Sequence, residues 1–154
     1  MFNFRLEPLI KIRKNVLQEC QAALAKAYDE RRVLEEQLQE IEHQLAEGTA
    51  TARSLMQPGQ TVNVDYLLGI RRQEMFLIAN QNVLIQDIQK TDEKIERCRI
   101  AVVAANKEVK ILEKLKEKRY EQYLEEEKRE ETKEMDEIVG RSQSLMRRQK
   151  EKAV

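Results

Sequence analysis

The sequence predicts an all-α protein, a two-helix antiparallel coiled-coil hairpin whose C-terminal helix is the longer one. Charged residues make up 36% of the 154 residues and aromatic residues 5%, with only 4 Gly and 2 Pro, which favours long helices over a wide globular core. Apolar stripes that repeat every 3.5 residues run through two segments. The pair Pro58–Gly59 separates them and is the clearest turn signal in the chain.

The first helix is predicted at about residues 7–56, after a short lead-in at Phe2–Leu6. Pro8 suits a first helical turn, where its missing N–H costs nothing. Arg13 and Arg31 interrupt the stripe, either as residues that fix the register or as tolerated defects. The predicted seam is Ile10, Arg13, Leu17, Cys20, Leu24, Ala27, Arg31, Leu34, Leu38, Ile41 and Leu45.

The turn is predicted at about 57–62 and the second helix at about 63–140. Asn63 is a suitable N-cap, and Asp65 places a negative charge in the first turn. Eleven of the fourteen positions on the second stripe are apolar. They are Leu67, Ile70, Glu74, Leu77, Gln81, Leu84, Ile88, Thr91, Ile95, Cys98, Val102, Ala105, Val109 and Leu112.

A short turn between long helices forces them to pair antiparallel. If the turn is centred between Gly59 and Gln60, the numbers of opposed residues add up to about 119. Leu6 then lies opposite residue 113, where the second stripe ends. The same register places Cys20 beside Cys98 as free, neighbouring thiols.

Beyond the paired part, 16 of the 22 residues from Glu113 to Glu134 are charged. Charge pairs one turn apart predict a solvated single helix here. Residues 141–154 are expected to form a tail of decreasing order. We expect the whole chain, 1–154, to be one coiled-coil domain.

The charge balance and the motifs argue against several classes of function. With 28 basic and 28 acidic residues, the chain lacks the basic excess of a nucleic-acid binder. No apolar run approaches the ~20 residues of a membrane span, no signal peptide is recognisable, and two Cys fit a reducing cytoplasm. The single histidine, His43, has no nucleophile or metal-ligand set around it. We therefore expect a cytoplasmic non-enzyme with no cofactor, no metal and no small-molecule substrate.

Partner binding remains, and two surfaces are candidates. Near the turn, Met75, Phe76, Leu77 and Ile78 form an apolar run that exposes part of its side chains. Alternatively, these side chains pack on the end of the first helix at residues 55–56. At the opposite end, the N-terminal residues meet the charged overhang that follows residue 112, which is either a docking site or simply a solvated face.

Two stretches of the chain are distinctive. Residues 4–13, Phe-Arg-Leu-Glu-Pro-Leu-Ile-Lys-Ile-Arg, resemble the N-terminal signature of the bacterial FliJ family. Residues 112–119 and the charged run from Glu125 to Glu137 resemble its C-terminal block. The resemblance implies a soluble stalk of the flagellar type III export apparatus, built like the central stalk of rotary ATP synthases. It also implies three partners: the export ATPase hexamer, the export gate membrane protein and export chaperones.

The resemblance further implies where the partners bind. With Glu35–Leu38 matched to the family's Glu-Glu-Gln-Leu stretch, gate contacts fall near the turn. Together with the apolar run, the gate set is Gln37, Ile41, Gln44, Met75, Phe76, Ile78, Asn82 and Ile85. The ring-end set, which enters the ATPase pore, is Phe4, Arg5, Leu6, Leu115 and Arg119. The protein would then associate peripherally with the cytoplasmic face of the inner membrane through the gate.

The leading hypothesis is therefore a rigid adaptor that couples the ATPase ring to the gate. One alternative is an escort that binds export substrates or unladen chaperones along its sides. The other is a generic coiled-coil spacer that dimerises into a four-helix bundle.

Overall fold

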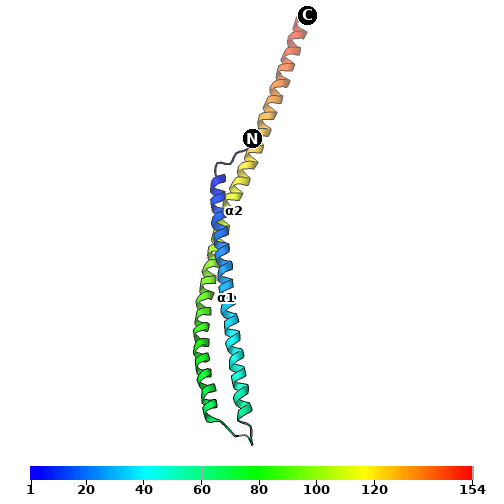
Figure 1. Ribbon diagram of the computed structural model, residues 1–154. Coiled ribbons are helices and arrows are strands. Elements are labelled where there is room, and N and C mark those ends of the chain that lie inside the picture. Colours follow the sequence, from blue (N-terminus) through cyan, green and yellow to red (C-terminus); the bar gives the residue numbers. More distant parts are fainter. Residues whose placement is uncertain (60, 154) are drawn as a thin grey trace. The chain divides into compact units, whose positions relative to one another are not determined.

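Two long helices make up almost the entire described chain (Figure 1). The computed structural model describes residues 1–59 and 61–153; of the predicted turn and tail, Gln60 and Val154 lie outside the described residues. Helix α1 comprises Glu7–Leu55 (49 residues), and α2 comprises Val64–Lys152 (89 residues). Residues 1–59 and 61–153 contain no strand, so the predicted all-α class is confirmed.

Each helix contributes to two compact units. The loop unit is Asn15–Ala105, and the terminal unit combines Met1–Lys14 with Asn106–Val154. That the chain is a single domain stays a prediction.

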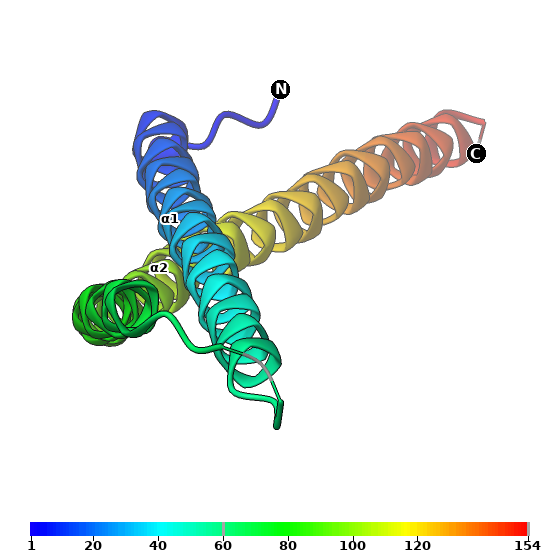
Figure 2. The same cartoon turned by 60° about the horizontal axis from the view of Figure 1, so that its bottom comes forward.

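In the loop unit the two helices run antiparallel and are joined by the loop at 56–63 (Figures 1 and 2). Two ion pairs cross between them: Arg31 Nε lies 2.6 Å from Asp92 Oδ1, and Lys94 Nζ lies 3.1 Å from Glu30 Oε2. Each such exposed pair contributes only ~0–1 kcal/mol. The apolar seam must therefore supply most of the pairing energy.

The predicted seam is confirmed at every position of both stripes. Each of these residues is buried or half-buried, from the fully buried Ala27 to the 6%-exposed Leu77 and Ile95. Among the described residues, however, no large side chain is fully buried. A two-helix seam covers only one face of each side chain, which is why this core is thin.

The two arginines in the first stripe both form ion pairs across to α2. Arg31 bridges Asp92 and, at 2.8 Å, Glu35 of its own helix. In the terminal unit, Arg13 lies 2.7 Å from Glu108. Their aliphatic stems cover the seam while the guanidinium groups reach its edge, which favours the register role over a tolerated defect.

The predicted register is displaced by about one helical turn. Glu7 pairs with Lys116, four residues beyond the position expected to oppose it. In the loop unit, the Arg31 partner Asp92 also lies four residues beyond the expected position. The expectation assumed a symmetric turn, but the ion pairs show that the helices pair in a register offset from the midpoint of the loop.

The displaced register changes the expectation for the thiols. Cys20 and Cys98 are both free and half-buried. Because α2 is shifted by about one turn, they are not the directly opposed pair that the predicted register requires.

The loop ends are built from local signals. The Tyr66 amide N–H donates to Asn63 Oδ1 at 3.4 Å, so Asn63 caps α2 as expected. Gly59 has a φ of +90°, a conformation that side chains with a Cβ rarely adopt.

The C-terminal end of α2 differs from the sequence expectation. The helix continues to Lys152 instead of ending near residue 140. A single glycine, Gly140, lowers the stability of a helix by only ~1 kcal/mol relative to alanine. The positive charges of Lys150 and Lys152 in the last turn interact favourably with the negative end of the helix dipole. From Leu124 to residue 153 every side chain is exposed, so this segment is a helix without an intramolecular partner.

Within the described residues, neither helix contains a stretch apolar and long enough to cross a membrane.

Candidate partner-binding surfaces

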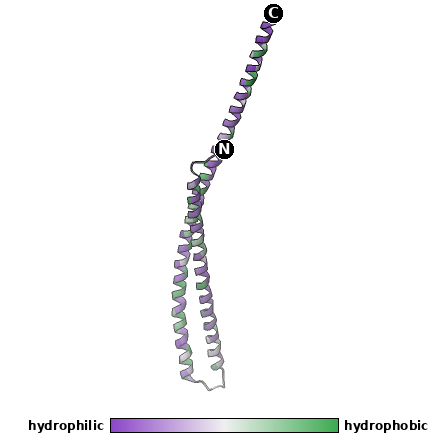
Figure 3. Cartoon of the chain, turned by 45° about the horizontal axis from the view of Figure 1, so that its top comes forward, coloured by the Kyte–Doolittle hydropathy of each residue, from purple (hydrophilic) through white to green (hydrophobic). Residues whose placement is uncertain are grey.

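The first candidate surface lies on α2 near the loop and carries no charge. Residues 75–86 are twelve consecutive uncharged residues in a chain that is 36% charged. Met75 is 73% exposed, Phe76 64% and Val83 56%, whereas Leu77 between them is buried in the seam. We call residues 75–86 the loop-end surface. Figure 3 shows hydrophobic residues along this part of α2, whereas the segment near the C-terminus is mainly hydrophilic.

The predicted gate residues fall into two groups by burial. Seven of the eight are exposed: Gln37, Gln44, Met75, Phe76, Ile78, Asn82 and Ile85. Ile41 is half-buried in the seam, so packing explains it. Since Met75 and Phe76 are largely exposed, the alternative that they pack against the end of α1 is not what the structure shows.

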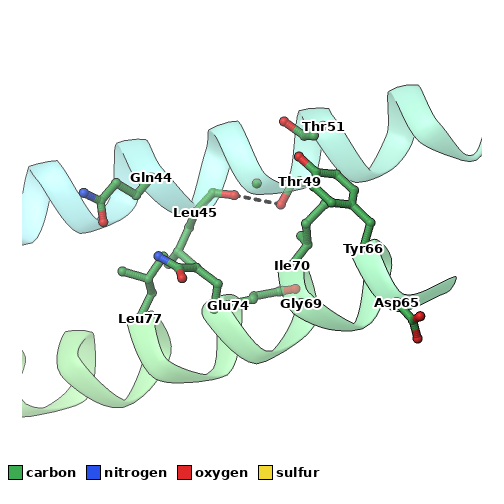
Figure 4. A pocket seen from close by; sticks show the side chains of 12 residues that line it. Gln44, Leu45, Thr49, Thr51, Asp65, Tyr66, Gly69, Ile70, Glu74 and Leu77 are labelled. Atoms are coloured by element: carbon green, nitrogen blue, oxygen red, sulfur yellow. Dashed lines mark hydrogen bonds between the residues drawn. The ribbon is translucent and has the colours of Figure 1, made fainter. Parts of the chain in front are cut away.

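A groove lies beside this surface, between α1 and α2 (Figure 4). It has a volume of about 390 Å³, and Gln44 and Leu77 are among its lining residues. Gly48 and Gly69, one on each helix, have no side chain to fill it, and no atom lies within 4 Å of where their Cβ would be. Among the predicted gate residues, only Gln44 lines this groove.

Two threonines of α1 are held along the groove by their own helix. The Thr49 hydroxyl donates to the Leu45 carbonyl at 3.0 Å, and the Thr51 hydroxyl donates to the Glu47 carbonyl at 2.9 Å. Figure 4 shows Tyr66 reaching from α2 toward these threonines. The groove therefore presents satisfied hydroxyls, aliphatic side chains and an aromatic ring to a partner, with Asp65 and Glu74 also lining it.

The second candidate surface belongs to the terminal unit. All five predicted ring-end residues, Phe4, Arg5, Leu6, Leu115 and Arg119, line one cavity of about 750 Å³. We call these five residues the terminal surface. Phe4 is only 9% exposed and Leu6 half-buried, whereas Arg5 and Arg119 are exposed. Phe4 therefore holds the N-terminal segment in place, and the two arginines are the groups available to a partner.

An aromatic cluster holds the N-terminal segment against α2. The Phe2 ring lies 5.3 Å from the Tyr120 ring in an edge-to-face arrangement and 5.5 Å from Tyr123. The Tyr123 hydroxyl donates to Glu127 Oε1 at 2.8 Å, and this bond raises the pKa of Tyr123. Sequence reasoning missed both tyrosines, although their spacing of three residues on a predicted helix was a usable signal.

Ion pairs also close this end. Lys116 Nζ lies 2.8 Å from Glu7 Oε2, and its hydrogen bond lowers the pKa of that carboxyl. Lys14 Nζ lies 3.4 Å from Glu113 Oε1. Glu7 also opens α1, where a negative charge is favourable.

Neither surface assembles groups for catalysis or metal binding within the described residues. His43 Nε2 lies 2.9 Å from Glu47 one turn along α1, and both side chains are mainly exposed. Across residues 1–59 and 61–153, no group of three or more His, Cys, Asp or Glu residues is placed to hold a metal ion. What the geometry offers is contact surface on paired helices, which is typical of proteins that act by binding other proteins.

Comparison with known protein families identifies the family. Residues 1–150 match the family described as flagellar FliJ protein, so the chain belongs to the FliJ family. Among solved structures, it is similar to a Chlamydia trachomatis protein described as a proposed YscO homologue, with 21% identity and a TM-score of 0.47. The match covers 96% of this chain and 99% of the other. No curated protein sequence matches significantly.

Proposed function

We propose that this FliJ-family protein is the stalk of the flagellar type III export apparatus, and that it couples the hexameric export ATPase to the export gate in the inner membrane. The loop-end surface contacts the gate, and the terminal surface enters the ATPase ring. The protein acts without catalysis, cofactor or metal. It works in the cytoplasm and reaches the cytoplasmic face of the membrane through the gate.

The loop-end surface is the observation that carries this proposal. An uncharged stretch of twelve residues exposes Met75, Phe76 and Val83 although the surrounding helix is highly charged. Exposed apolar side chains lower the solubility of a protein. When a partner covers them, the removal of this apolar surface from water contributes to the free energy of binding. Flexible Met and rigid Phe are also the side chains that partner surfaces favour.

The terminal surface supports the other half of the proposal. Aromatic packing and an ion pair hold its backbone, from which the exposed side chains of Arg5 and Arg119 extend. Guanidinium groups bind carboxylates bidentately. This surface therefore suits acidic side chains in the lumen of a ring.

The antiparallel pairing supports a mechanical role for each unit. A lone helix frays and bends, but helices that share a seam and cross-helix ion pairs move together. Within each unit, an applied force is then transmitted along packed backbone and is not lost in local unfolding.

The test compares two double variants with the same chemistry on the same helix. Met75→Ser with Phe76→Ser removes two exposed apolar side chains from the loop-end surface. Ile100→Ser with Val103→Ser removes two others, 61% and 54% exposed, from a position outside it. We expect the first pair to abolish recovery of the gate protein and motility, and the second to leave both unchanged. Equal behaviour of the two pairs would refute the loop-end assignment.

A second candidate function is the escort of unladen export chaperones along the sides of the hairpin. A side groove of about 600 Å³, lined by Val33 and Leu34 of α1 and by Thr91 of α2, favours it. Val33→Ser separates the two functions. An escort loses chaperone binding in this variant, whereas the stalk keeps its gate and ATPase contacts.

A further inference from the structure

We propose that the exposed C-terminal part of α2 pairs with the same segment of a second copy of this chain, in antiparallel orientation. The segment is residues 124–152, which we call the overhang. This pairing does not rest on the proposed contacts with the ATPase or the gate.

The overhang carries an apolar stripe that none of the described residues covers. Its members lie on one helical face, in two groups about two turns apart, and are between 50% and 62% exposed. They are Met135, Ile138, Val139, Leu145 and Met146. A helix that keeps such a stripe in water is a helix that lacks its partner.

The distribution of charge identifies the partner. Residues 125–137 contain eight acidic and three basic residues, whereas residues 141–152 contain five basic and one acidic residue. The stripe is centred between these two blocks. The overhang is therefore complementary to itself when reversed, which is the requirement for an isologous twofold interface.

Antiparallel alignment about residues 140–141 matches both features at once. It sets Met135 directly opposite Met146 of the second copy, and it brings Ile138 within two residues of the position opposite Leu145 of the second copy. At the edge of the stripe, Glu131 lies opposite Lys150 of the second copy. Parallel alignment would instead place the acidic residues 125–137 of one copy beside the same acidic residues of the other, and these like charges repel each other.

The first experiment measures self-association. The mass of the full chain is followed by sedimentation equilibrium over about a hundredfold range of concentration. We expect a rise from monomer toward dimer that weakens in high salt, because complementary charges contribute. A monomer at every concentration would overturn the proposal.

A matched pair of variants locates the interface. Ile138→Ser, 60% exposed, and Ile111→Ser, 65% exposed, make the same change on the same helix inside and outside the overhang. Since a dimer buries Ile138 twice, Ile138→Ser should weaken association about a hundredfold or more. Ile111→Ser should leave it unchanged, and equal effects would contradict the assignment.

Cysteine cross-linking tests the orientation. In a background of Cys20→Ser and Cys98→Ser, Met135→Cys and Met146→Cys are oxidised separately and as a mixture. Antiparallel copies hold two residues at position 135 about 16 Å apart along the axis, beyond the ~7 Å limit for a disulfide. The mixture should therefore cross-link and each single variant should not. Efficient self-linking of Met135→Cys would mean parallel pairing and would overturn the antiparallel proposal.

Discussion

The loop-end surface and the terminal surface differ in where they place their large apolar side chains. At the loop end, large apolar side chains such as Phe76 are exposed to solvent and do not pack in the seam. At the terminal end, the aromatic residue Phe4 is buried and Phe2 packs on Tyr120. The first surface displays its hydrophobic groups, and the second uses them to hold a charged face in shape.

This difference shows why burial must be known before a hydrophobic residue is assigned a role. Phe4 and Phe76 were both predicted as partner-binding residues, yet they are 9% and 64% exposed. Substituting Phe4 should act first on folding of the terminal unit, whereas substituting Phe76 should act first on binding. The predictions below exploit that contrast.

The largest expected effect separates two adjacent residues at the loop end. Leu77→Ala removes a side chain that is 6% exposed and should lower the free energy of unfolding by about 2–3 kcal/mol. Phe76→Ala should change it by less than ~0.5 kcal/mol. Urea unfolding followed by circular dichroism measures both, and a large loss from Phe76→Ala would mean that Phe76 has a structural role.

Phe4→Ala should have the next largest effect, and that effect should be local. Loss of this buried ring should destabilise the terminal unit by about 2 kcal/mol, because the open end of a hairpin relaxes more easily than an enclosed core. Hydrogen exchange should accelerate at the Ile10 amide, which donates to the Leu6 carbonyl at 3.1 Å, and remain unchanged at Ile95. Equal acceleration at both amides would show that the terminal unit is not a separate cooperative element.

Glycine substitutions should have smaller effects of opposite sign. Gly59→Ala forces an alanine into a φ of +90° and should destabilise the loop by about 1 kcal/mol. Gly48→Ala meets no atom within 4 Å and should stabilise α1 by up to ~1 kcal/mol. Thermal unfolding distinguishes them, and a stabilising Gly59→Ala would contradict the left-handed turn.

The smallest effect concerns pH at the terminal end. Lys116 lowers the pKa of Glu7 below its ordinary value of 4.5, so the pair stabilises the fold above that value. This contribution is lost as the pH falls through the lowered pKa of Glu7. Exchange at the Ile10 amide, corrected for its intrinsic rate, should rise over that range in the native protein. In Glu7→Gln it should already be raised and independent of this titration, and a native-like pH profile would exclude Glu7 as its source.

Much of the fold could be predicted because helical periodicity is local. Positions such as Ala27, Leu77 and Ile95 follow from spacing alone, and Asn63 follows from cap chemistry. The register could not be predicted from the turn, because it depends on how two distant segments pack, as the contact of Arg31 with Asp92 shows. The C-terminal end of α2 could not be predicted from apolar periodicity, because the last part of the helix has no partner among the described residues and ends on the favourable charges of Lys150 and Lys152.

The candidate surfaces were predictable only in outline. The exposure of Met75 and Phe76 could be predicted, because consecutive apolar residues of a helix cannot all face the seam. The groove between Gly48 and Gly69 depends on how two distant segments face each other, and sequence alone does not give that arrangement. The role of Phe4 depends on its packing in the same way.

The most direct test of the central claim measures two partners with two variants side by side. The purified gate protein and the purified export ATPase are each titrated with Met75→Ser/Phe76→Ser and with Arg5→Glu/Arg119→Glu. We predict that the first variant loses gate binding and keeps ATPase binding, and that the second does the reverse. If both variants lose the same partner, or neither loses any, the assignment of one partner to each surface is wrong.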